Sequence, residues 1–257
     1  MMLLIDIGNT NTVCALYDGK SYVMNQRILP NENIQSVLID KLFNEGIISS
    51  ANSAYGNLNH IAIASVVPKM TDIYWKLFMK NYNIDSFIIS HENAGITLKV
   101  DSHEEVGNDR ICNVRAANEL TQKNCLVIDF GTATTYDVIN NKQEFIGGAI
   151  APGIDVSANY LIKKAALLKS TTFKFPENII GKNTNTNIQS GVMFGAISSI
   201  EGMISMIQNE IKSELSIILT GGFSQLISSK LSYKHILKPN LTLDGIRLIY
   251  KDNNEKL

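Results

Sequence analysis

The chain has 257 residues, and its composition, 45% hydrophobic and 18% charged, is that of a folded globular protein. With 23 Lys and Arg against 24 Asp and Glu, the net charge of −1 gives no general attraction to nucleic acid or to an anionic membrane. We find no apolar run that approaches the roughly 18 residues of a membrane helix, and the first residues lack the basic region of a secretory signal. Cys14, Cys112 and Cys125 have no metal-ligand spacing. We therefore expect a cytoplasmic protein with reduced thiols and without nucleic-acid or membrane partners.

The chain contains one internal repeat. Residues 3–12 read LLIDIGNTNT, and residues 126–135 read LVIDFGTATT. In both copies an apolar, β-branched run ends in Asp-x-Gly and is followed by a second strand-like run, at residues 12–17 and 134–139. Two copies half a chain apart predict a duplicated domain, because a solenoid would need many short repeats.

The other expected elements alternate between strands and helices. Apolar runs predict strands at residues 60–67, 86–90, 144–151 and 217–219. Helical spacing, with Pro68 opening the first helix, predicts helices at residues 68–82, 108–122, 154–168 and 187–212. The polar tail at 251–257 is expected to fray. We predict an α/β fold of two lobes, residues 1–118 and 119–257, with mixed β-sheets flanked by helices and a last helix able to pack back on the first lobe.

Both Asp-x-Gly turns could bind a nucleotide. A strand that ends in this way places a carboxylate at the edge of a sheet, with backbone N–H groups beyond it. Asp6 could hold Mg²⁺ while the polar turn at residues 8–12 cradles phosphate oxygens. The alternative is a plain β-hairpin turn, in which Asn and Gly are ordinary residues. The second copy, and Gly221-Gly222 after another strand, favour ATP binding, and the common P-loop, dinucleotide and protein-kinase motifs do not occur in the sequence.

A third cluster, GNDR at residues 107–110, stands at the start of a predicted helix. An Asp at such a place is most often an N-cap, and an Arg beside it is usually a surface charge. Phosphoryl transfer needs a base for the acceptor hydroxyl and positive charge near the transferred group. Asp109 and Arg110 have that chemistry, so both interpretations stay open.

Taken together, these segments resemble the type III pantothenate kinases, members of the actin, sugar kinase and heat-shock chaperone ATPase superfamily. The resemblance is carried by DIGNTNT at residues 6–12, GNDR at 107–110, DFGTAT at 129–134 and GGAIAPG at 147–153, with GKNT at 181–184 and QSG at 189–191 in addition. It implies an actin-like ATPase fold built from two ribonuclease-H-like lobes.

The resemblance also implies an activity and a set of site residues. The activity is MgATP-dependent phosphorylation of the 4′-hydroxyl of pantothenate, the first step of coenzyme A biosynthesis. Asp109 would be the general base, Asp6 would hold Mg²⁺, and Asp129 would hold the monovalent cation, K⁺ or NH₄⁺. The residues that would bind ATP are Asp6, Ile7, Gly8, Asn9, Thr10, Asn11, Thr12, Val13 and Thr132. Those that would bind pantothenate are Val100, Gly107, Asn108, Asp109, Arg110 and Thr184.

One position departs from the family pattern. Val100 stands where the family usually has a Tyr, which keeps an apolar wall but removes a hydroxyl. A kinase of the same superfamily for another small hydroxylated acceptor is therefore an alternative. A second alternative is a nucleotide-binding regulatory protein without turnover, against which the presence of Asp6, Asp109 and Asp129 argues.

The resemblance implies a homodimer as well. Gly191, Gly195 and Gly202 fall on one face of the predicted helix at 187–212, and glycines allow the backbone of another helix to approach closely. The sequence leaves open whether that helix belongs to the same subunit or to a second one.

Overall fold

The computed structural model describes residues 1–28, 58–164 and 172–254, and the chain divides into two compact units. The first unit comprises Met1–Ile96, Asp101–Ala116 and Thr242–Leu257, and the second comprises Thr97–Val100 and Ala117–Leu241. Helix α3 (Asn108–Leu120) therefore begins in the first unit and ends in the second. Each unit has its own sheet and its own hydrophobic core.

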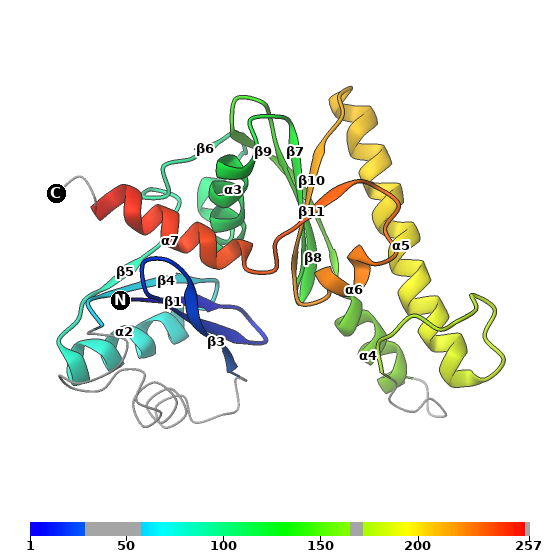
Figure 1. The fold of residues 1–257 in the computed structure, drawn as a ribbon, viewed down its shortest axis with the longest axis horizontal. Coiled ribbons are helices and arrows are strands. Elements are labelled where there is room, and N and C mark those ends of the chain that lie inside the picture. Colours follow the sequence, from blue (N-terminus) through cyan, green and yellow to red (C-terminus); the bar gives the residue numbers. More distant parts are fainter. Residues whose placement is uncertain (29–57, 165–171, 255–257) are drawn as a thin grey trace. The chain divides into compact units, whose positions relative to one another are not determined.

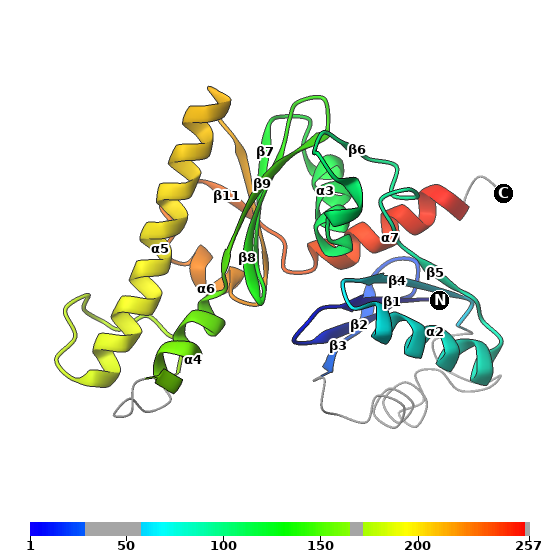
Figure 2. The ribbon, with the colours of Figure 1, turned by 180° about the vertical axis from the view of Figure 1, so that it is seen from behind.

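The sheet of the first unit has the strand order β3-β2-β1-β4-β5. Its strands are β1 (Met2–Ile7), β2 (Thr12–Tyr17), β3 (Tyr22–Ile28), β4 (His60–Ser65) and β5 (Ser86–Ile88). Strands β1, β2 and β3 are antiparallel neighbours, whereas β4 and β5 run parallel to β1. Helix α2 (Pro68–Tyr82) covers one face of this sheet (Figure 1, Figure 2) and buries Tyr74 and Phe78 in the core.

The sheet of the second unit repeats this arrangement. Its order is β11-β10-β7-β8-β9-β6, and β7, β8, β9, β10 and β11 match β1, β2, β3, β4 and β5 in both order and direction. The bounds are β6 (Thr97–Leu98), β7 (Cys125–Phe130), β8 (Ala133–Ile139), β9 (Glu144–Pro152), β10 (Ser216–Gly221) and β11 (His235–Leu237). The duplication that the sequence predicts is therefore confirmed at the level of sheet topology.

Among the described residues, three helices belong wholly to the second unit: α4 (Ile154–Lys164), α5 (Thr184–Ile211) and α6 (Ser224–Ser228). Helix α5 lies along the sheet (Figure 1, Figure 2) and buries Met193, Ile197, Ile200 and Ile204 against it. It begins three residues before the predicted start because Asn183 caps it: the Asn183 side chain accepts from the N–H of Thr186 at 3.0 Å, and the Thr186 hydroxyl accepts from the N–H of Asn183 at 3.2 Å. The part of the predicted 154–168 helix beyond residue 164 lies outside the described residues.

By length and composition α5 is a candidate membrane span, which the sequence analysis missed. One 18-residue window has a mean hydropathy of 1.4, and 28% of that window is buried. The expectation concerned an uninterrupted apolar run, and this window is interrupted by polar residues, among them Glu201. A single helix of this kind is weak evidence for a span, because core helices of soluble proteins pass the same test.

Strands β3, β6 and β11 and the last helix are not among the elements predicted with bounds from the sequence. That helix, α7 (Leu241–Asn254), follows β11 and belongs to the first unit. It includes residues 251–254, so the prediction that the tail frays from residue 251 was wrong for these residues.

Candidate functional site

The first Asp-x-Gly turn is an open polar turn. Leu3, Ile5 and Ile7 of β1 lie in the core under α2, so the alternate residue Asp6 points to the other face of the sheet. The turn from Gly8 to Asn11 is closed by the N–H of Gly8, which donates to the Asn11 carbonyl at 2.9 Å. Asn9 and Thr10 are exposed on it. Backbone N–H groups and polar side chains thus accompany the Asp6 carboxylate, as a phosphate site requires.

Asp109 lies in the first turn of α3 and is not its N-cap. The carbonyl of Gly107 accepts the first helical hydrogen bond, from Ile111 at 3.1 Å, so Gly107 occupies the capping position. Asp109 Oδ1 instead accepts from the N–H of Arg110 at 2.8 Å. The carboxylate folds back over Gly107, where an added Cβ would lie 2.5 Å from Oδ1, so Gly107 provides the space that this conformation needs.

Burial raises the pKa of Asp109 above its ordinary value. The N–H and the charge of Arg110 oppose this shift but do not cancel it. A carboxyl group with a raised pKa can take up a proton more readily than an ordinary Asp, which is the property of a general base.

The first unit brings Asp6 and the GNDR segment together. The N–H of Val66 donates to the carbonyl of Ile7 at 3.1 Å, and Asn108 Nδ2 donates to the carbonyl of Ser65 at 3.0 Å. These two bonds connect the end of β1, the end of β4 and the start of α3. Both carboxylates also act on one buried thiol: burial raises the pKa of Cys112, and the charges of Asp6 and Asp109 raise it further.

A cavity that the sequence did not indicate lies beside Asn108 in the first unit. Its volume is about 550 Å³, and it is mostly apolar. It is lined by Ser65, Pro68, Thr71, Asp72, Trp75, Ile88, Ile89, Ser90 and Asn108. The cavity stands where the parallel strands β4 and β5 end, which is a common place for a ligand in an α/β sheet.

The second Asp-x-Gly turn is tighter. It has two residues between its strands, and Gly131 N–H donates to the Ala133 carbonyl at 3.0 Å. Gly221, at the end of β10, has a φ of +87°, and a Cβ added there would lie 2.3 Å from Asp129 Oδ1. Gly221 therefore lets the end of β10 lie directly against the Asp129 carboxylate, which a side chain at position 221 would displace.

Val100 and Thr184 belong to the second unit, unlike Gly107, Asn108, Asp109 and Arg110. Val100 is half-buried, and Thr184 is exposed at the first residue of α5. Thr184 lines a cavity of about 670 Å³ between α4, α5 and the end of β9. The structure thus divides the residues predicted to bind the acceptor between the two units.

The predicted close approach at the α5 glycines is not made within the described part of the chain. Gly191 and Gly195 line the same cavity as Thr184. Apart from the adjoining residues and backbone of α5 itself, no heavy atom of the described residues lies within 4 Å of the Cβ that would be added at either position. This face of α5 is therefore open.

The duplicated sheets and the two Asp-x-Gly hairpins define an actin-like ATPase fold. The structure of MreB5 of Spiroplasma citri bound to AMPPNP resembles this chain with a TM-score of 0.55 at 10% identity, covering 99% of this chain and 97% of that one. A conserved protein of Campylobacter jejuni, described as a proposed Baf family transcriptional activator, resembles it with a TM-score of 0.60 at 20% identity, covering 98% and 99%. At these identities the likeness shows the fold alone.

The sequence comparisons give the family within this fold. The sequence model of the type III pantothenate kinases matches residues 2–206. The type III pantothenate kinase of Geobacillus kaustophilus is 35% identical over 259 residues, covering 100% of this chain and 99% of the relative. The chain belongs to the type III pantothenate kinase family. It is therefore a kinase that uses ATP, and the prediction of the family and of the enzyme class is confirmed.

Proposed function

We propose that this protein transfers the γ-phosphoryl group of ATP to the 4′-hydroxyl of pantothenate, the first step towards coenzyme A, in the cytoplasm. Membership of the family supports the reaction. The observation that carries the chemistry is the half-buried Asp109 carboxylate, whose pKa is raised by burial and whose charge, like that of Asp6, raises the pKa of the Cys112 thiol.

Asp109 is the general base of this reaction. The proton of the acceptor hydroxyl passes to the Asp109 carboxylate, the hydroxyl oxygen forms a bond to the γ-phosphorus, and the bond from that phosphorus to its bridging oxygen breaks, so that ADP leaves. Burial of Asp109 favours the step, because a base works best when its pKa lies near the working pH. Gly107 and Asn108 hold the turn, and Arg110 adds positive charge next to the base.

Asp6 holds Mg²⁺, with Gly8, Asn9, Thr10 and Thr12 on the ATP phosphates. No group of three or more His, Cys, Asp or Glu side chains suited to a metal occurs in the part of the chain that the structure describes. A single carboxylate fits Mg²⁺ nevertheless, because in kinases this ion is held by one or two carboxylates together with phosphates and waters. When bound, it neutralises charge on the phosphates.

Asp129 holds the monovalent cation, K⁺ or NH₄⁺, and Thr132 contacts ATP. Support comes from the position of the Asp129 carboxylate against the backbone of Gly221, at the end of β10, where a Cβ would lie 2.3 Å from Oδ1. Cations of this kind are bound by oxygen atoms, which the carboxylate supplies.

The protein is a homodimer, and the open face of α4 and α5 is its interface. Val156, Tyr160 and Leu161 of α4 are exposed at 44%, 63% and 48%, next to the cavity that contains Gly191 and Gly195. A contiguous exposed apolar face of this kind marks an association surface. Leu161→Glu would place a charge in this face, so it is expected to yield monomers in light scattering, whereas Lys230→Glu, at an exposed position outside α4 and α5, should remain dimeric.

The test of the reaction is ADP release by the purified protein with MgATP and K⁺, with and without pantothenate. Release is expected to depend on pantothenate and to fall by about 10²–10⁴-fold in Asp109→Asn, the usual scale for a lost general base. Calorimetry should show ATP binding retained in that variant. Near-normal turnover in Asp109→Asn would remove Asp109 from the mechanism, and ATP binding without any release would favour another acceptor or a regulatory protein.

A further inference from the structure

The C-terminal helix α7 lies outside the segment that matches the family model, residues 2–206, and no function has been assigned to it above. It crosses α3, the helix that begins with Asn108 and Asp109 (Figure 1, Figure 2). The contacts between these two helices lie in the first unit, within two turns of Asp109.

The crossing point is Gly245, which is buried. A Cβ added at Gly245 would lie 2.0 Å from the carbonyl oxygen of Cys112 and 2.7 Å from its Cα. The backbone of α7 therefore rests directly on the backbone of α3, and any side chain at position 245 would force the two helices apart.

Cys112 follows Asp109 by three residues, so both lie on one face of α3, one turn apart. The charges of Asp6 and Asp109 both raise the pKa of the Cys112 thiol. A shift of α3 at Cys112 would therefore change the distance from Asp109 to the end of β1, where Asp6 stands.

A hydrogen bond accompanies the crossing. Thr242, in the first turn of α7, donates from Oγ1 to Asn113 Oδ1 at 2.9 Å, and Asn113 is fully buried. A buried amide oxygen that loses its donor is costly, so this bond fixes the rotation of α3 about its own axis.

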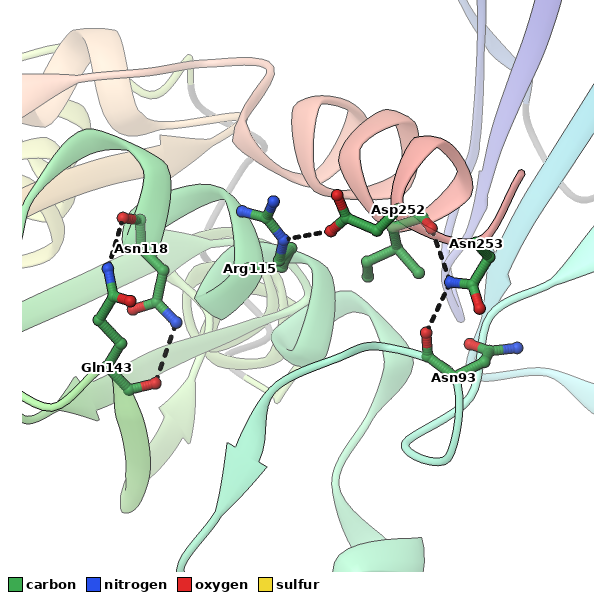
Figure 3. Close-up of polar contacts among 7 residues, drawn as sticks. Asn93, Arg115, Asn118, Gln143, Asp252 and Asn253 are labelled. Carbon is green, nitrogen blue, oxygen red and sulfur yellow. Dashed lines mark hydrogen bonds and ion pairs between the residues drawn. The ribbon is translucent and has the colours of Figure 1, made fainter. Parts of the chain in front are cut away.

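The other end of α7 is anchored to the same unit. Arg115 Nε donates to Asp252 Oδ2 at 2.8 Å, and Asn253 Nδ2 donates to the carbonyl of Asn93 at 2.9 Å (Figure 3). Tyr250 Oη and His60 Nδ1 are 2.7 Å apart. With both ends held, α7 resists a displacement of the helix beneath it.

We infer that α7 is a brace that positions the general base. Through Cys112 and Asn113, Gly245 and Thr242 hold α3 in the position from which Asp109 reaches the acceptor hydroxyl. The inference rests on the proposed role of Asp109. Gly245 and Thr242 are positioning residues, because they contact α3 and act through it.

The main test is Gly245→Ala. Real Cβ atoms keep at least 3.0 Å from such neighbours, and the added Cβ would start at 2.0 Å, so α3 and α7 must separate by about 1 Å. A displacement of that size is expected to lower kcat by about 10–100-fold. The KM for ATP should change little, because the turn at residues 8–12 is on neither helix. Circular dichroism at the assay temperature, well below the midpoint of unfolding, confirms that the variant is folded.

A double-mutant cycle with Asp109→Asn separates the brace from a general loss of structure. If Gly245 acts through Asp109, Gly245→Ala has almost no further effect on the residual kcat of Asp109→Asn. If the two effects multiply, the brace inference is wrong. If Asp109→Asn alone keeps normal turnover, the proposed base fails instead, so the two failures can be told apart.

A milder pair of variants covers the case in which Gly245→Ala does not fold. Thr242→Val removes the donor to Asn113 and is expected to lower kcat by several-fold. Thr242→Ser keeps the hydroxyl and is expected to have the kcat of the parent protein. Asn254→Ala, at the far end of the helix, where Nδ2 donates to the carbonyl of Tyr250 within α7 at 2.8 Å, is the control and should lower stability slightly while leaving kcat unchanged. Equal kcat values in Thr242→Val and Thr242→Ser would overturn the inference.

Discussion

The two Asp-x-Gly hairpins share a sequence pattern and a strand pairing, yet their turns differ. The first has four residues between its strands, with Asn9 and Thr10 exposed, and a Cβ at Gly8 would meet the Asn11 carbonyl at 3.2 Å. The second has two residues, and its Asp129 carboxylate lies against Gly221 from another strand.

The difference shows how one duplicated element can acquire two tasks. In both hairpins, alternation along the strand places the apolar residues in the core and the Asp on the other face. The longer turn then offers backbone N–H groups, which suit phosphate. The shorter turn has its carboxylate against Gly221 at the end of β10, where we propose that it holds a cation. In the roles that we propose, turn length and a strand far along the chain distinguish the two hairpins, while the Asp and Gly are common to both.

The largest expected effect comes from exchanging the two carboxylates for amides. Asp6→Asn should weaken MgATP binding and lower the rate by about 10²–10³-fold, because the lost charge acts at the phosphates. Asp129→Asn should keep MgATP affinity and lose the activation by K⁺ or NH₄⁺. Calorimetry with MgATP, and turnover in K⁺ against Na⁺, measure both. Equal loss of ATP affinity in the two variants would show that Asp6 and Asp129 do not have the different roles proposed for them.

A smaller effect is expected from the glycines of the same turns. Gly221→Ala places a Cβ 2.3 Å from Asp129 Oδ1 at a φ of +87°, so it combines a clash with backbone strain. Strain of this kind costs about 1–3 kcal/mol of unfolding free energy. Gly8 has no positive φ and more room, so Gly8→Ala should cost less than about 1 kcal/mol. Urea unfolding of the two variants gives the comparison, and a larger loss in Gly8→Ala would show that the first turn is the more tightly packed.

The strands of both hairpins could be predicted from the sequence because their burial follows local alternation. Strands β6 and β11 could not, since they have two and three residues and exist through pairing with distant partners. Strand β3 alternates weakly, with exposed and half-buried residues between its two buried positions. Residues 251–254 are polar, and they remain helical where Asp252 and Asn253 bond to Arg115 and Asn93.

The site residues also divide into those that the sequence could indicate and those that only the folded structure shows. Asp6, Asp109 and Asp129 could be proposed from motifs, because each lies at the end of a strand or the start of a helix. The roles of Gly107, Gly221 and Gly245 could not, because each is defined by an atom that packs against it: Asp109 Oδ1, Asp129 Oδ1 and the Cys112 carbonyl. For Gly221 and Gly245 that atom lies far away in the chain, and only the folded structure brings it near.

The smallest expected effect contrasts Asp109 with Asp18, a carboxylate in the turn after β2. Burial raises the pKa of Asp109, whereas the N–H groups of Ser21 and Lys20 lower the pKa of Asp18. A raised folded-state pKa means that the folded chain holds its proton to higher pH than the unfolded chain, so stability falls as the pH rises through that pKa. Asp109→Asn, which cannot ionise, is therefore expected to melt at a higher temperature than the parent protein at neutral pH.

The pH dependence separates this effect from a change in packing. The gain in Asp109→Asn should shrink as the pH approaches the usual Asp pKa of about 3.9, because both proteins then carry a neutral side chain. Asp18→Asn should show the opposite sign, a small loss at neutral pH that also fades on acidification, since its carboxylate stabilises the folded state when ionised. Thermal melts across this range test both. If the melting temperature of Asp109→Asn were raised by the same amount at every pH, the cause would be better packing of the amide. Burial of the Asp109 charge would then have no cost to the stability of the folded protein.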